Sequence, residues 1–134
     1  MPAVGIDTNI FLRVFIDDDG QQHRLAVELV RTKGQVFVGT VVMVEAVWAL
    51  RSLFKFSKEK LVQFVNTVLE AEAFILENRP VIEAALFSFS SGKAGFADCV
   101  IVESARQRGM GPVHTFDRDL ALTEGAVLVK TRPR

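Results

Sequence analysis

The sequence predicts an α/β domain built on a mainly parallel sheet, and two observations carry this prediction. Short apolar runs of strand length alternate along the chain with longer segments of helical periodicity. Asp7 and Asp117 each follow directly after a strand-like run, and in open parallel sheets functional groups gather outside the carboxyl ends of the strands. We therefore expect a three-layer α/β/α sandwich with about four to five strands in its central sheet.

The bulk composition is that of an ordinary globular protein. The 134 residues suit a single domain, 1–134, and 49% of them are hydrophobic against 24% charged. Because 16 basic residues balance 16 acidic ones, a nucleic-acid-binding function would have to rely on local patches or bound metal. The single Cys99 can form no internal disulfide, and no signal peptide or membrane span is apparent. We expect a cytoplasmic protein.

The first half of the chain is expected to begin with a short buried strand at 3–6 that ends at Asp7. Later segments follow the same alternation, with helices at 9–15 and 22–32, a strand at 36–38, helices at 41–55 and 58–70, and a strand at 74–76. Residues 41–55 are apolar almost all round at their start, which predicts a buried helix. Residues 58–70 are amphipathic, and Ser57 is placed to cap them.

The second half repeats the alternation. Its expected elements are helices at 80–89 and 95–108, a strand at 113–115, a short helix at 119–122 and a strand at 126–129. Pro80 suits the first turn of a helix because that turn needs no backbone N–H donor. Gly109 is placed to end the helix over 95–108.

Two acidic residues at strand ends are candidate active-site groups. Asp7 closes the first strand, and Asp117 follows the strand at 113–115, with Asp119 two residues further on as an alternative or additional acid. Each aspartate also has a purely structural interpretation, as a helix N-cap or a turn residue.

Two further acids lie in otherwise apolar helices. Glu45 is the only polar residue between Val41 and Leu50, and Asp98 lies near the start of a helix, close to Gly95. An ionised carboxylate in a buried helix is costly unless it is paired or binds metal. The alternatives are a narrow solvent-exposed stripe around Glu45 and a capping role for Asp98.

Taken together, the four acids indicate a divalent metal site. Carboxylates that converge at one sheet edge repel each other, and Mg²⁺ or Mn²⁺ offsets that repulsion through the oxygen ligands that it prefers. His23 and His114 lie far apart in the sequence, so no His or Cys cluster offers a zinc site.

At these residues the chain resembles the PIN-domain family, and within it the VapC toxins of toxin–antitoxin pairs. The resemblance spans about residues 4–129, and its motifs are Ile6-Asp7-Thr8-Asn9, the lone Glu45, Phe96-Ala97-Asp98 and Thr115-Phe116-Asp117-Arg118-Asp119. It implies a PIN-like fold, an endoribonuclease that uses one or two Mg²⁺ or Mn²⁺ ions, a dimer, and inhibition by a VapB-type antitoxin. Matched to the family, Asp7, Glu45, Asp98 and Asp117 form the acidic set and Asn9 and Thr115 orient it, while Asp119 has a less settled role.

Substrate-binding residues are less well indicated than the acids. For each candidate phosphate contact the favoured interpretation is an ordinary solvated surface charge; the candidates are Arg13, Arg51, Lys55, Lys93, Arg106 and Arg118. Four aromatic residues are candidates either for the core or for a dimer or antitoxin surface, namely Phe11, Phe15, Trp48 and Phe54.

Three rival functions remain open at this stage. A phosphoacceptor signalling domain also carries acids at strand ends, but it gives Glu45 no role. A PIN nuclease of RNA processing or repair predicts the same chemistry without an antitoxin. A binding module with a relic metal site predicts loss of acids, whereas all four are present.

Overall fold

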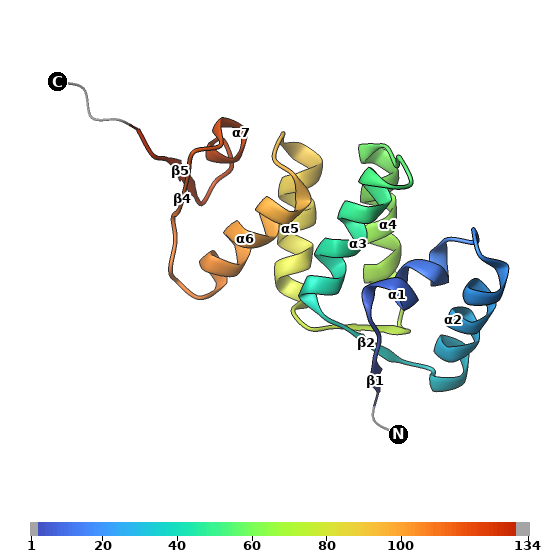
Figure 1. The fold of residues 1–134 in the computed structure, drawn as a ribbon. Helices are drawn as coiled ribbons and strands as arrows, with labels where there is room; N and C mark the ends of the chain where they lie inside the picture. The colour runs from blue at the N-terminus through green and yellow to red at the C-terminus, as the bar shows by residue number, and fades with distance from the viewer. Residues whose placement is uncertain (1–2, 131–134) are drawn as a thin grey trace. The chain divides into compact units, whose positions relative to one another are not determined.

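The computed structural model describes residues 3–130 and divides into two compact units, Met1–Arg79 and Pro80–Arg134 (Figure 1). The elements of the first unit are β1 (Val4–Gly5), α1 (Thr8–Phe15), α2 (Gly20–Lys33), β2 (Val36–Val38), α3 (Thr40–Ser52), α4 (Lys58–Glu70) and β3 (Phe74–Leu76). Those of the second are α5 (Arg79–Ser91), which begins at the boundary, α6 (Phe96–Gln107), β4 (Val113–Thr115), α7 (Arg118–Ala121) and β5 (Ala126–Leu128). The predicted alternation of strands and helices is confirmed.

All the strand pairs are parallel, as predicted. In the first unit the order is β1-β2-β3, with Val4 beside Val36 and Val36 beside Phe74. In the second unit β4 pairs with β5, and Thr115 lies beside Leu128. The five described strands are thus hydrogen-bonded as three plus two, each set within its own unit.

The core of the first unit contains an aromatic cluster. Phe11 is fully buried, and its ring centroid lies 5.5, 5.7 and 5.3 Å from those of Phe15, Phe64 and Phe74. Phe11 is therefore a core residue, and its alternative placement on a partner surface is wrong for this structure. Phe15 is half-buried, with its ring packed against the same cluster. The Phe15 and Phe74 rings meet Phe11 edge to face, and such pairs add to the free energy gained by burying the rings.

Two helices begin or end away from their predicted positions for local reasons. Helix α2 starts at Gly20 because Asp19 caps it, with the Gln22 N–H donating to Asp19 Oδ1 at 3.2 Å. Helix α3 ends at Ser52, three residues before the predicted end, and Lys55 has a positive φ of 59°. A left-handed residue cannot continue a right-handed helix.

Between residues 3 and 130, no helix combines the length and the apolar character needed to cross a lipid bilayer.

Candidate functional site

Asp7 lies between β1 and α1 and caps the helix. The Ile10 N–H donates to Asp7 Oδ1 at 2.9 Å. Side chains that accept such a bond satisfy one of the free N–H groups at the helix start. Asp7 is exposed, and within residues 3–130 its Oδ2 accepts no hydrogen bond. The capping role therefore occupies one carboxylate oxygen and leaves the other available to a cation.

Glu45 is joined to this region by a residue that the sequence did not single out. The Thr8 hydroxyl donates to Glu45 Oε1 at 2.6 Å, which links the start of α1 to the middle of α3. Hydrogen bonds to ionised acceptors of this length are among the stronger ones. The only signal in the sequence is that Thr8 directly follows Asp7 and carries a hydroxyl. The neighbouring Asn9, predicted to orient the acids, is exposed.

The predicted burial of Glu45 is wrong. Helix α3 buries Met43, Ala46 and Leu50, but it exposes Glu45 together with Val41 and Trp48, which are 69% and 61% exposed. These three residues follow a spacing of four and three, so they share one helix face. The composition of the helix alone could not reveal that this mostly apolar face is exposed to solvent. The free-energy cost of burying a charge therefore does not support a metal-binding role for Glu45. The support comes instead from its hydrogen bond with Thr8, which joins it to the Asp7 region.

Asp98 occupies the first turn of α6, where the N-cap is Gly95 and no side chain makes a capping bond. Asp98 is half-buried, and in the described part of the chain its carboxylate has no hydrogen bond or ion pair. The capping alternative therefore does not account for this residue. Both carboxylate oxygens of Asp98 are therefore open to a ligand, near the positive end of the helix.

Asp117 lies in a turn held by Thr115. The Asp117 N–H donates to the Thr115 hydroxyl at 2.9 Å, while Asp117 Oδ1 accepts from the N–H groups of Asp119 and Leu120 at 2.8 and 3.1 Å. Thr115 thus fixes the backbone from which Asp117 projects; its orienting role in a metal site stays a prediction. Asp119 is exposed and lines a pocket of about 470 Å³ within the second unit, together with Lys93 and Arg106.

The chemistry of these side chains suits a hard divalent cation, because they offer carboxylate oxygens and no soft ligand. Asp7 and Glu45 belong to the first unit, and Asp98, Asp117 and Asp119 to the second. Taken separately and over its described residues, neither unit gathers three or more Asp, Glu, His or Cys side chains in a metal-binding arrangement.

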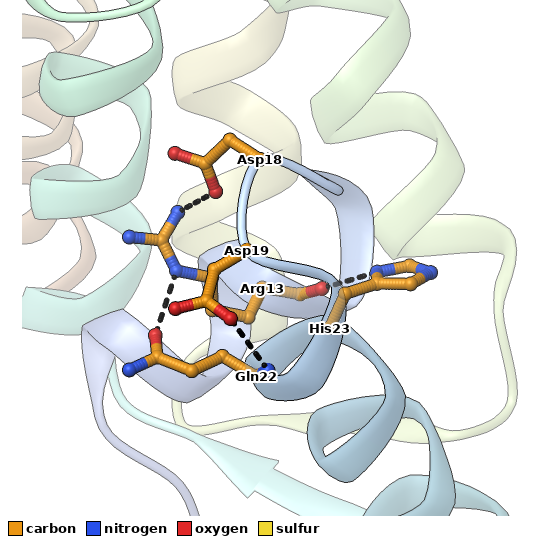
Figure 2. A network of polar contacts seen from close by, with 5 residues as sticks. All are labelled: Arg13, Asp18, Asp19, Gln22 and His23. Carbon is orange, nitrogen blue, oxygen red and sulfur yellow. Dashed lines mark hydrogen bonds and ion pairs between the residues drawn. The ribbon is translucent and has the colours of Figure 1, made fainter.

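Among the predicted phosphate contacts, Arg13 has a structural role (Figure 2). Its Nη1 donates to Asp18 Oδ1 at 2.6 Å and its Nε to Gln22 Oε1 at 3.1 Å. The ring Nδ1 of His23 lies 2.7 Å from the Arg13 carbonyl oxygen. The Arg13 side chain is 20% exposed. These bonds fasten the end of α1 to the start of α2, which lie side by side.

The other cationic candidates differ in how they are engaged. Lys55 donates to the Ser52 carbonyl at 3.0 Å, and Arg106 to the Glu124 carbonyl at 3.1 Å. Arg51, Lys93 and Arg118 are exposed, and among residues 3–130 none of these three has a hydrogen bond or an ion pair. They remain the predicted cations with free charge.

Comparison with known proteins gives two matches. The sequence profile of the PIN domain matches residues 4–126, which spans both units. The VapC ribonuclease of Aquifex aeolicus (strain VF5) is 31% identical over 91 residues, covering 68% of this chain and 67% of the relative. The resemblance read from the sequence motifs is thereby confirmed.

Proposed function

Because this chain belongs to the PIN-domain family, we propose that it is a ribonuclease of the VapC type, which hydrolyses RNA with the help of Mg²⁺ or Mn²⁺. The observation that carries the proposal is the set of four acids in the order of the family motif, whose side chains keep carboxylate oxygens free of protein hydrogen bonds within residues 3–130. The similarity to a VapC ribonuclease supports the choice of RNA as substrate. The proposal treats residues 1–134 as a single PIN domain, since the family profile matches residues 4–126.

We assign the residues of this chain to metal-binding and positioning roles. Asp7, Glu45, Asp98 and Asp117 would hold the cation, and Asp119 is available as a further acid. Thr8 fixes one oxygen of Glu45, and Thr115 fixes the turn that carries Asp117. When bound, the metal ion supplies an acidified water and offsets charge on the phosphoryl oxygens.

We further propose that the protein is the toxin of a toxin–antitoxin pair, forms a homodimer and acts in the cytoplasm. A VapB-type antitoxin would restrain it by covering the acidic residues. The exposed face of α3 with Val41 and Trp48 is a candidate partner surface, because large exposed apolar side chains are typical of protein interfaces.

The nuclease proposal is tested by incubating purified protein with labelled RNA and either Mg²⁺ or Mn²⁺. Cleavage should stop when EDTA removes the metal. The variants Asp7→Asn and Asp98→Asn should lose cleavage by at least about a hundredfold, as is usual when a group of the metal-binding set is removed. Asp17→Asn, an exposed aspartate outside the site, is the matched control and should cleave normally. Full cleavage in EDTA or by both site variants would contradict the mechanism.

The toxin role has a separate test. Expression of the wild-type chain without a partner should arrest growth of the host, and Asp98→Asn should not. Normal growth with soluble, RNA-cleaving protein would contradict the toxin role and leave the nuclease function intact.

A further inference from the structure

The carboxyl ends of β4 and β5 bring together residues that are distant in the sequence. The two strands are parallel, with Thr115 beside Leu128, and the Val129 N–H donates to the Thr115 carbonyl at 2.8 Å. Both strands therefore end at the same edge of the sheet. Phe116 and Arg118 follow one strand and Lys130 follows the other, so they emerge beside Asp117.

Two cations line one pocket at this place. A cavity of about 650 Å³ is bordered by Arg118 and Lys130 and otherwise by apolar residues of α7, its C-cap Leu122 and β5, among them Val127. No acidic side chain is among the described residues that line it. Both cations are exposed, and over residues 3–130 neither is neutralised by an ion pair. This pocket is therefore locally positive in a chain whose overall formal charge is zero.

An aromatic ring lies next to the candidate acid. Phe116 immediately precedes Asp117, and it is 83% exposed. Phe116 precedes Arg118 by two residues, and an exposed ring combined with free cations is typical of surfaces that bind unpaired nucleotides, because bases stack on the ring while the cations contact phosphates.

From this arrangement we infer that the carboxyl edge of β4 and β5 binds single-stranded RNA, with Arg118 and Lys130 contacting phosphates and Phe116 stacking on a base. The inference rests on the proposed ribonuclease function and adds the residues that position its substrate. It also explains how a chain of zero net charge can hold RNA, because binding draws on this local surface rather than on a general basic excess.

Binding is measured on Asp98→Asn protein, by fluorescence anisotropy with a labelled single-stranded oligoribonucleotide at several salt concentrations. Added to that background, Phe116→Ala should weaken binding about 5- to 100-fold with an unchanged salt dependence, as for loss of one stacked base. Arg118→Gln and Lys130→Gln should each lower the slope of log affinity against log salt by about 0.7, the value for one phosphate of a single strand. Phe116→Trp should restore binding.

The control variants change equally exposed residues elsewhere. Phe87→Ala removes a ring that is 74% exposed, and Lys33→Gln removes an exposed cation of α2; both should bind RNA like the parent. Parental affinity and salt dependence in all three test variants would overturn the inference and assign this surface to a protein partner. Failure of the wild-type chain to cleave RNA would instead count against the proposed function, since these binding measurements require no cleavage.

Discussion

The two units hold their candidate acids in different ways. In the first unit, Glu45 projects from an exposed face of a long helix and is fixed by another side chain, the hydroxyl of Thr8. In the second unit, Asp117 lies in a turn and is fixed by backbone N–H groups and by Thr115. A side-chain contact depends on the packing of α1 against α3, whereas a turn depends mostly on local sequence. The position of Glu45 should therefore be more sensitive to tertiary packing than that of Asp117.

The two units also differ in their cores, because the first has more aromatic packing and a larger sheet than the second. The first unit surrounds Phe11 with three other rings beside a three-stranded sheet. The described part of the second unit has one close ring pair, Phe89 and Phe96 at 5.8 Å, and a two-stranded sheet. Because two strands alone are marginally stable, the second unit depends strongly on the packing of its helices.

The largest expected effect comes from breaking the aromatic core. Phe11→Ala should lower the free energy of unfolding by about 3–5 kcal/mol, because it leaves a large cavity in a fully buried site. Urea unfolding followed by circular dichroism measures the loss. If the two units form one domain, the whole chain should lose structure in a single transition. Unfolding of the first unit alone would show that the units are independent, and Phe87→Ala should shift the midpoint little.

The next effect concerns the two threonines. Thr8→Val removes the hydrogen bond to Glu45 and should reduce RNA cleavage about tenfold, as is usual when the partner of a metal-binding group is lost. Thr115→Val should have a smaller effect, since Asp117 keeps the two backbone donors to its Oδ1. The Mg²⁺ concentration for half-maximal cleavage is the readout, and Thr8→Ser should preserve it. An equal loss of RNA cleavage in both valine variants would show that Glu45 and Asp117 do not differ in how strongly they depend on their threonine partners.

A smaller effect is expected at Arg13. Because its guanidinium fastens α1 to α2 through Asp18 and Gln22, Arg13→Met should lower the free energy of unfolding by up to about 1 kcal/mol. Its affinity for RNA, measured in the Asp98→Asn background, should stay at the parental level. A loss of affinity comparable to that of Arg118→Gln would return Arg13 to the RNA-binding set.

The smallest expected effect is a pH dependence of the folding stability that arises from the first unit. On α2, hydrogen bonds and charge attraction from Arg31 lower the pKa of Glu28 below its ordinary value. A carboxylate whose pKa is lowered by folding stabilises the protein above its unfolded pKa, and this contribution is lost as the pH falls through the folded pKa. Both side chains are largely open to solvent, so the change in stability should be slight. The contribution of ionised Glu28 is measured by comparing the stability–pH curves of wild type and Glu28→Gln at acidic pH. Identical curves would contradict this prediction.

Much of this structure follows from local sequence. The bounds of β2, α4, β3 and β4 agree with their predicted ranges, because apolar periodicity and a cap such as Ser57 act over a few neighbouring residues. The order and spacing of the acids also lie in the sequence, and they were enough to identify the family to which the profile match later assigned the chain.

Other features were decided only by the tertiary structure. The open face of α3 that exposes Glu45, the partnership of Thr8 with that residue, and the structural use of Arg13 all depend on which helices pack together. The meeting of Lys130 with Arg118 depends on the parallel register of two strands. Periodicity shows that a helix has two faces, but only packing decides which face is buried and which side chains meet. For this reason the sequence alone determined the elements and the candidate acids, while the tertiary structure decided how those acids are held.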